Sequence, residues 1–416
     1  MKNSSFWSPQ PRYRLYTSPT RYLTAVKNLF NSNDDKVHTL EKKLKDFFQT
    51  PYAIATPTAR FGIYLVIKHL IKPGQEVILS PITISDVVNM VICAGGIPVF
   101  TDVEKETCNI NSELIEDKIN SNTGAVLITH LHGLACDLNT INELCRRKNI
   151  PLIEDSAQAF TTEVQGKRCG TTGIAGIYSF GSHKNITGFF GGAIILKDKE
   201  LCNSIRKEIS QYPVFPLSNY FKKVITGFLT DIATFHGLFQ IFTFKIFKFA
   251  FLKDITKIND LVIVDKVPVL KKSLPQGYKL RMRPTQAAVI LKQLSLVERD
   301  TEERIKRAKI YYNGLKSIPQ LTLPPMKEDL SHIYTYYPIQ FSHRRELNKF
   351  ALRNNRDWVL SHYQNHASVK AFSEYYSDCP MASSVANTLI YLPTYPRYPI
   401  SEVYKNIDTL KKYFRV

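Results

Sequence analysis

Short apolar runs alternate with longer amphipathic stretches between residues 58 and 200. Helical spacing is clearest at 58–71, which runs into a Pro73-Gly74 turn, and at 138–148. This alternation predicts an α/β fold with a mostly parallel sheet that helices cover on both faces. In such sheets ligands bind beyond the carboxyl ends of the strands, so candidate chemistry should follow the apolar runs. The runs with strand character are 77–79, 97–103, 125–129, 152–154, 174–180 and 193–196.

Residues 219–254 depart from this pattern, because large apolar side chains recur there at alternating steps of four and three. A membrane-spanning helix needs about 20 predominantly apolar residues. The window 224–244 has that length but holds Asp231, His236, Gln240 and four threonines, so a spanning helix is not expected. The recurring positions, which we expect on one helical face, are Phe221, Ile225, Phe228, Ile232, Phe235, Phe239, Phe242 and Ile246.

Three interpretations of this segment stay open. It can be a helix of the core or of a dimer interface, an amphipathic helix on an anionic membrane surface, or a helix that binds in the groove of a partner protein. Basic residues favour the membrane interpretation, because each adds about 1 kcal/mol of attraction near an anionic surface. They are Lys222, Lys223, Lys245, Lys248 and Lys253.

The remainder of the chain predicts a second, smaller unit. A helix is expected over 285–315, followed by an α+β tail rich in Tyr and Pro. A chain of 416 residues also exceeds the size that one core usually supports. We therefore predict a large domain at 1–218, the apolar insert at 219–275 and a small domain at 276–416.

The formal charge of +19 favours polyanionic partners, such as a phosphorylated substrate or an anionic membrane. Nucleic acid suits the charge too, but no nucleic-acid-binding motif accompanies it, so none is expected as a partner. The seven cysteines form no C-x-x-C pair, and neither a disulfide framework nor a metal site is expected. No apolar run near the N-terminus is long enough for a signal peptide, which predicts a cytoplasmic location.

Three short segments place chemistry at the expected ends of strands. Asp155 ends one apolar run, where a carboxylate can keep a pyridinium nitrogen protonated. Lys184 lies four residues after Phe180, where a partly desolvated amine can form a Schiff base, and Ser179 and Ser182 can donate to a phosphate. Thr58 opens a helix, and helix N-termini bind anions.

Each segment also has a simpler interpretation. Asp155 and Thr58 suit the N-cap of a helix, where Asp and Thr side chains accept backbone N–H bonds. Lys184 alone is one of many lysines that can lie on the surface. The combination is more specific than any one segment, because all three fall where such a fold would place a site.

In this order and spacing the segments resemble the DegT/StrS family of sugar aminotransferases, which are pyridoxal-phosphate (PLP) enzymes of fold type I. Asp-Ser-Ala-Gln at 155–158 is similar to the family's Asp-x-x-Gln signature, and Ser-Phe-Gly-Ser-His-Lys at 179–184 is similar to its Schiff-base motif. The resemblance runs from about residue 37 to the C-terminus and is weakest at 219–275. Supporting matches are 77–103, 130–133, 166–170, 191–193, 281–282, 286–288 and 392–396.

The resemblance implies a role for each matching residue. Lys184 would be the Schiff-base lysine and proton shuttle, Asp155 would pair with the pyridine nitrogen, and Gln158 would contact the phenolic oxygen of the ring. The phosphate would be bound by Thr58, Ala59 and Ser179. The implied reaction is ping-pong: glutamate or glutamine leaves its amino group on the cofactor, and a keto sugar, linked to a nucleotide or a lipid, takes it up.

The sequence departs from the family pattern at four positions. Ile84 stands where an aromatic residue usually stacks on the cofactor ring, and Pro57 stands where Gly is usual. Phe190 replaces an acidic residue, and Lys279 replaces an Asn that reaches the phosphate of the partner subunit. A lysine can still bind phosphate as a point charge, so a homodimer with shared active sites is expected.

Alternative functions follow from the same resemblance. Some relatives carry His in place of the lysine and dehydrate their sugar, whereas this chain keeps Lys184, which favours transamination. Aminotransfer to a lipid carbonyl is a further enzymatic alternative. A non-catalytic membrane scaffold would not need Lys184, Asp155 and Gln158 together.

Overall fold

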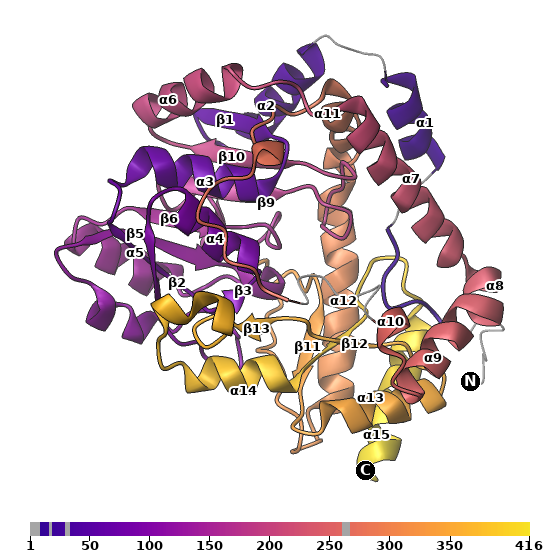
Figure 1. Ribbon diagram of the computed structural model, residues 1–416. Coiled ribbons are helices and arrows are strands. Elements are labelled where there is room, and N and C mark those ends of the chain that lie inside the picture. Colours follow the sequence, from indigo (N-terminus) through magenta and orange to yellow (C-terminus); the bar gives the residue numbers. More distant parts are fainter. Residues whose placement is uncertain (1–8, 16–18, 30–33, 260–266) are drawn as a thin grey trace.

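The structure is a computed structural model that describes residues 9–15, 19–29, 34–259 and 267–416. The prediction on the absence of a signal peptide concerns residues that lie mostly outside this part of the chain. A seven-stranded sheet forms the centre of the larger unit (Figure 1). Its order is β1 (Tyr52–Thr56), β10 (Gly192–Leu196), β9 (Ala175–Ser179), β6 (Leu152–Asp155), β5 (Thr123–Thr129), β2 (Glu76–Leu79) and β4 (Ile97–Phe100).

The predicted α/β class with a mostly parallel sheet is confirmed. Only β10 pairs antiparallel with its neighbours in this sheet, and the other described strands all run in one direction. Six of the strands match the predicted apolar runs, whereas β1 was not predicted. The parallel strands place their carboxyl ends at one edge, and this edge is where a ligand is expected.

Helices cover both faces of the sheet because successive strand residues point to opposite sides. Val77 and Leu79 of β2 pack in a hydrophobic cluster on one face of the sheet, and Ile78 between them packs in a cluster on the opposite face. The first cluster includes α3 (Ala59–Leu70), α4 (Ser85–Cys93) and α6 (Lys199–Ser210). The opposite face is covered by α2 (Asp35–Phe48), α5 (Leu138–Arg147) and α11 (Pro284–Leu291). Near the N-terminus, α1 (Pro19–Lys27) packs on α11.

The helix predicted over 285–315 is wrong as a single element. It is divided into α11 and α12 (Val297–Leu315), with a short 3₁₀ turn at Leu294–Leu296 between them. α11 packs in the large unit, where Ala287 contacts the α2 cluster. α12 begins in that same core with Val297 and reaches the core of the small unit with Ala308 and Tyr311. The domain boundary at residue 276 stays a prediction.

The small unit is an α+β layer, as predicted. Its sheet has the order β11 (Tyr337–Gln340), β14 (Leu389–Leu392) and β12 (Val359–Leu360). The helices are α12, α13 (Arg344–Arg353), α14 (Pro380–Thr388) and α15 (Ile400–Phe414). A second pairing, between β13 (Gln364–Asn365) and β3 (Ile82–Thr83), joins this unit to the large one. A two-stranded hairpin, β7 (Glu163–Val164) and β8 (Lys167–Arg168), completes the described strands.

The apolar insert is helical but not one helix. It contains α7 (Leu217–Ala233), α8 (His236–Leu238), a π-helical turn at Phe239–Thr243, α9 (Phe244–Leu252) and α10 (Thr256–Asn259). The axis bends by 68° between α7 and the segment 236–252. No single helix of the described residues is long and apolar enough to cross a membrane, although the bent pair together meets such a test of length and composition.

Candidate active site

Strand register brings the predicted phosphate-binding residues together. Thr56 of β1, Gly192 of β10 and Ser179 of β9 are paired in one row across the sheet. The chain leaves β1 after Thr56 and enters α3, so Thr58 and Ala59 lie at the end of this row. A Cβ on Gly192 would lie 2.4 Å from the Ala59 nitrogen, and only glycine permits this close approach of strand and helix start.

The N-terminus of α3 is suited to an anion. The Thr58 hydroxyl caps the helix by accepting the Phe61 amide at 3.1 Å, which confirms the predicted cap. Within the described residues the amides of Ala59 and Arg60 have no hydrogen-bond acceptor, so both can donate to a bound phosphate. Capping and anion binding therefore occur at the same place.

The two serines that were expected to donate to a phosphate differ in their contacts. The Ser179 hydroxyl lies at the end of β9 and accepts a long bond of 3.4 Å from the Gly181 amide, which leaves its proton available. The Ser182 hydroxyl donates to the Phe189 carbonyl at 3.2 Å. Donation of either hydroxyl to a phosphate stays a prediction.

Asp155 is the last residue of β6 and is buried beside the strands β5 and β9. No helix begins after it: residues 156–161 form turns, and Oδ1 accepts the Ala157 amide at 3.0 Å. The helix-cap interpretation of Asp155 is therefore wrong. Burial raises the pKa of its carboxyl, and the opposing effects of the Ala157 amide, Lys184 and His130 do not cancel this rise.

Lys184 is half-buried on the turn that follows β9, and its amide bonds the Gly181 carbonyl at 3.2 Å. Burial lowers the pKa of its amine. The negative charge of Asp155 partly opposes this, and the positive charge of Arg60 adds to it. The amine is neutral more often than that of an exposed lysine, as a Schiff-base nucleophile requires. The interpretation of Lys184 as an ordinary surface lysine is therefore wrong.

Gln158 is fixed by contacts with both units of the chain. Its Oε1 accepts the His132 amide at 3.1 Å, and its Nε2 donates to the Tyr363 hydroxyl at 2.7 Å. Tyr363 directly precedes β13, whose pairing with β3 brings it from the small unit to the site. The implied contact of Gln158 with a ring oxygen stays a prediction, and Tyr363 is a site residue that the sequence did not indicate.

A charged cluster beside the helix start was also missed. Asp86 of α4 forms ion pairs with Arg60 of α3 and with Lys271, and it accepts the Tyr278 hydroxyl at 2.9 Å. Burial raises the pKa of Asp86, but these bonds outweigh it and hold the pKa below its usual value. The cluster fixes the segment that carries the half-exposed Lys279. Sequence spacing gave no signal for it, because Lys271 and Tyr278 lie 185 and 192 residues from Asp86.

Two further features complete the surroundings of Lys184. Tyr13 from the N-terminal segment packs against Tyr336, with ring centroids 5.7 Å apart. Together with Lys184 and Thr394 they line a cavity of about 40 Å³. Ile84, which stands at the usual ring-stacking position, is half-buried immediately before α4. The N-terminal segment is therefore part of the site, which the sequence did not suggest.

These residues fit a pyridine cofactor with a phosphate. The site offers free amides at a helix N-terminus for the phosphate, a buried carboxylate for a protonated ring nitrogen, and a lysine with a lowered pKa for a Schiff base. The three groups lie at the carboxyl edge of one sheet, where the fold places ligands. The donor set thus agrees with PLP.

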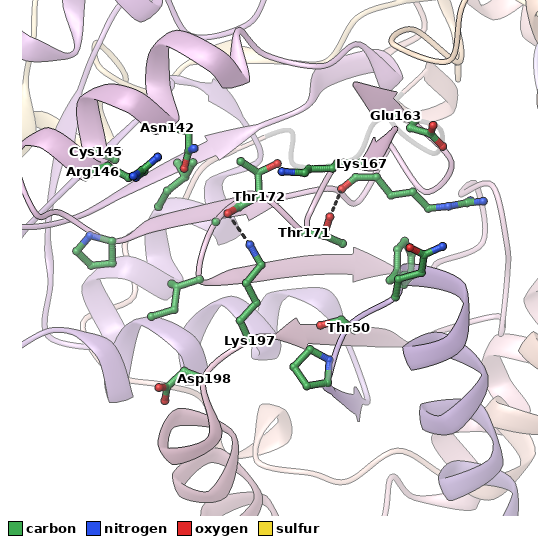
Figure 2. Close-up of a pocket in the computed structure, with 18 of the residues that line it drawn as sticks. Thr50, Asn142, Cys145, Arg146, Glu163, Lys167, Thr171, Thr172, Lys197 and Asp198 are labelled. Carbon is green, nitrogen blue, oxygen red and sulfur yellow. Dashed lines mark hydrogen bonds between the residues drawn. The ribbon is translucent and has the colours of Figure 1, made fainter. Parts of the chain in front are cut away.

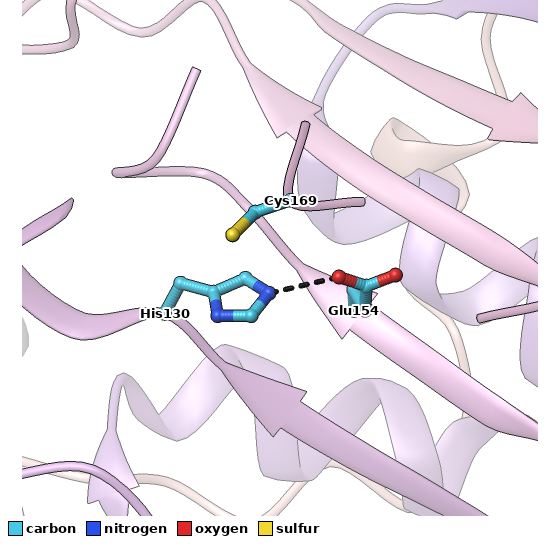
Figure 3. A group of neighbouring side chains, drawn as sticks. All are labelled: His130, Glu154 and Cys169. Atoms are coloured by element: carbon cyan, nitrogen blue, oxygen red, sulfur yellow. Dashed lines mark hydrogen bonds and ion pairs between the residues drawn. The ribbon is translucent and has the colours of Figure 1, made fainter. Parts of the chain in front are cut away.

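Next to Asp155 lies a buried group of His130, Glu154 and Cys169, whose candidate ligand atoms are within 4.8 Å of one another (Figure 3). Glu154 accepts His130 Nε2 at 3.0 Å and the amides of Gly170, Thr172 and Gly173. His130 Nδ1 accepts the Cys136 amide at 3.1 Å.

These bonds occupy the electron pairs that a metal would need. Burial also raises the pKa of the Cys169 thiol, which keeps it protonated. Burial raises the pKa of Glu154 as well, but His130 and the backbone amides outweigh it and lower the pKa overall. We interpret the group as a structural network that anchors the loop after β8 and holds β6, and thereby Asp155, in position.

Glu154→Gln should test this interpretation. The substitution replaces one acceptor oxygen by an NH₂ group, which would place a donor opposite backbone N–H donors. We therefore expect the free energy of unfolding to fall by about 3 kcal/mol. Urea denaturation measures this, with Glu116→Gln, which breaks an exposed ion pair with Arg147, as the matched control. Equal stability of the two variants, or bound metal in the purified protein, would contradict a purely structural role.

A cleft of about 1250 Å³ lies away from these residues (Figure 2). It is lined by Thr50, Pro151 and Gly173, which directly precede or lie close to the amino ends of β1, β6 and β9. Lys197, whose Nζ donates to the Thr172 carbonyl at 2.8 Å, also lines it. The cleft is therefore at the opposite edge of the sheet from Lys184, and none of the predicted site residues line it.

Comparison with known proteins gives a consistent result. Residues 20–241 and 253–411 match the profile of the DegT/DnrJ/EryC1/StrS aminotransferase family. The spore coat polysaccharide biosynthesis protein SpsC of Bacillus subtilis is 24% identical, over 91% of this chain and 90% of its own. The dTDP-3-amino-3,6-dideoxy-alpha-D-galactopyranose transaminase of Aneurinibacillus thermoaerophilus is also 24% identical, with the same coverage of 91% and 90%.

A solved structure shows the same fold. The GDP-4-keto-6-deoxy-D-mannose-3-dehydratase of E. coli with bound hydrated PLP superposes with a TM-score of 0.76 at 17% identity, over 97% of this chain and 100% of that one. The fold therefore extends over both units of the chain, and it is shared by transaminases and dehydratases.

Proposed function

Because the chain belongs to the DegT/DnrJ/EryC1/StrS aminotransferase family, we propose that it moves an amino group from glutamate or glutamine to a keto sugar carried on a nucleotide or a lipid. It is an α/β enzyme of fold type I, and its cofactor is PLP. The observation that carries the proposal is that the buried carboxyl of Asp155 and the partly desolvated amine of Lys184 lie close enough to interact electrostatically at the carboxyl edge of the sheet.

Each residue has a defined task in this reaction. PLP, when bound, supplies an electron-accepting ring that stores the amino group between donor and acceptor. Asp155 holds the proton on the ring nitrogen, and the Lys184 amine accepts and returns the proton of the substrate carbon. Thr58, Ala59 and Ser179 bind the phosphate, and Gln158 contacts the phenolic oxygen.

The names of the relatives support a role in making surface glycans. One is a spore coat polysaccharide protein and another is a transaminase of a deoxyamino sugar nucleotide. Dehydration, the activity of the E. coli enzyme of the same fold, is the alternative. We favour transamination because Lys184 is retained and lies beside Asp155 in the site. A non-catalytic scaffold is not supported, since the catalytic set is complete.

The proposal includes a cytoplasmic homodimer in which Lys279 reaches the phosphate in the neighbouring subunit. In support, the ion pair between Lys271 and Asp86 holds the preceding segment against α4 and leaves Lys279 half-exposed. Two-fold dimers are also the commonest closed assembly.

Spectroscopy of the purified enzyme with amino donors, followed by a screen of acceptors, tests the function. We expect glutamate or glutamine to bleach the yellow enzyme, and a keto sugar on a nucleotide or lipid carrier to restore the colour and become an amino sugar by mass spectrometry. Lys184→Ala is the control that should do neither. A dehydrated product without nitrogen would instead identify the alternative reaction.

A further inference from the structure

The helices α7 to α9 expose an unusual number of large apolar side chains. Within 221–249, eleven of them are 37–58% exposed. Isolated apolar residues on a surface are ordinary, but a contiguous group of this kind marks an interaction site. The group, which we call the apolar face, consists of Phe221, Ile225, Phe228, Leu229, Ile232, Phe235, Leu238, Ile241, Phe242, Ile246 and Phe249.

On α7 the apolar face lies away from the protein. The helix packs inward through Tyr220 and Val224, which are buried with Phe189. Phe221 and Phe228 fall on a different arc of the same helix and are 46% and 50% exposed. A core helix would bury its apolar stripe, so the interpretation of the insert as a core helix is wrong for α7.

The segment 236–252 is attached to a different part of the protein and also exposes apolar groups. Phe239 and Phe244 are buried against Leu352 of α13, which fixes this segment on the small unit. Phe239 had been predicted on the same helical face as Phe221 to Phe235, but the helix breaks at Phe235, which has an extended backbone, and the 68° bend there turns Phe239 inward. Phe242 and Ile246 stay 57% and 52% exposed. Figure 1 shows α7 along one edge of the molecule and α9 returning toward α13.

The charge around the apolar face is positive. Residues 217–254 contain five lysines and two aspartates. The aspartates are compensated within the protein: Asp231 accepts the Tyr22 hydroxyl at 2.7 Å, and Asp254 pairs with Lys349 at 3.7 Å. Four of the lysines are exposed to solvent, so the face presents uncompensated positive charge: Lys222, Lys223, Lys245 and Lys253.

We propose that the apolar face of α7–α9 docks the enzyme onto the surface of an anionic lipid bilayer. Exposed Phe, Ile and Leu enter the interface, and the neighbouring lysines pair with lipid phosphates. A second copy of the chain suits the face poorly, because a two-fold contact of this patch with itself would bring its lysines together. Lipid supplies both the apolar and the anionic complement at once.

The geometry favours docking within one leaflet over spanning. α7 has 17 residues, about 25 Å of helix, against about 30 Å of hydrocarbon, and it carries Lys222, Lys223 and Asp231. The 68° bend and the attachment of α9 to α13 return the chain to the protein. The docking does not depend on the reaction that the enzyme catalyses, and its test needs no substrate.

Flotation of the purified full chain with vesicles, without detergent, tests the proposal. Wild type should float with phosphatidylcholine vesicles that contain phosphatidylglycerol, less so in high salt, and least with phosphatidylcholine alone. Phe228→Asp/Phe242→Asp should reduce binding at least about tenfold. Tyr376→Asp/Tyr404→Asp adds the same charge at two exposed aromatic residues outside the insert, 67% and 53% exposed, and should bind like wild type.

Urea denaturation and sedimentation of both double variants ensure that fold and oligomeric state are unchanged. Wild type that stays soluble with anionic vesicles, or equal flotation of the two double variants, would overturn the proposal. If Phe228→Asp/Phe242→Asp instead separates an oligomer into monomers, the face is covered by a second copy, and the membrane assignment is equally overturned.

Discussion

Replacing Lys184 with alanine is expected to leave a folded enzyme whose transamination falls by about 10⁴-fold or more. In the proposed reaction the Lys184 amine is both the covalent attachment for the cofactor and the group that carries the proton, so the variant should lose both functions together. Its lowered pKa, which burial causes, is what makes it reactive near neutral pH. The substitution leaves the start of α3 at Thr58 and Ala59 unchanged, where we propose that the phosphate binds, so cofactor should still bind without a covalent bond.

Borohydride reduction and peptide mapping measure this directly. Wild type should yield one adduct, on Lys184, and Lys184→Ala none. Lys197→Ala is the matched control, since Lys197 follows β10 at the opposite edge of the sheet, where its Nζ donates to the Thr172 carbonyl. It should keep both colour and rate. A reduced adduct on any other lysine of the wild type would contradict the assignment.

Much of the large unit was predictable because its strands are buried on both faces. Runs such as 125–129 are almost wholly apolar, as is typical of strands in a parallel sheet. They are also too short for a helix, which favours a strand. β1 was missed because Tyr52–Thr56 has only alanine, isoleucine and threonine after its tyrosine, with no alternating pattern to mark a strand. Its place beside β10 is set by tertiary pairing.

The site was predicted as far as local motifs reach. Asp155 ends a strand, Thr58 and Lys184 follow strands, and parallel strands bring their ends to one edge. Tyr363 and Tyr13 come from distant segments, one through the β13–β3 pairing and one through the N-terminal segment. Such contacts depend on how two units pack, which no spacing along the sequence records.

The insert shows the same limit in another form. Periodicity correctly indicated one apolar face on α7, but it does not say whether that face meets the protein or the solvent. Tyr220, Val224 and Gly227 decide the matter, because glycine allows α7 to approach Phe189 closely: a Cβ on Gly227 would lie 3.0 Å from that ring. The face of α7 that packs on the protein is the less apolar of its two faces. Amphipathicity alone would have predicted that the more apolar face is the buried one.

Asp155→Asn is expected to lower kcat by about 10²- to 10⁴-fold while cofactor occupancy changes little. Asparagine has the same shape and can still accept the Ala157 amide, which now bonds Oδ1 at 3.0 Å. It cannot hold a proton on the ring nitrogen, so the ring accepts electrons less well. The proposed phosphate site at the start of α3 does not involve this side chain, so cofactor binding should be maintained.

Kinetics together with a cofactor titration by absorbance separate these two effects. Asp137→Asn is the matched control, because Asp137 caps α5 by accepting the Thr140 amide at 3.2 Å, and asparagine caps equally well. It should retain the wild-type rate. If Asp155→Asn behaved in the same way, the carboxylate would only stabilise a turn after β6. A loss of activity that followed loss of cofactor in parallel would instead make Asp155 a binding residue, without a role in the electron transfer to the ring.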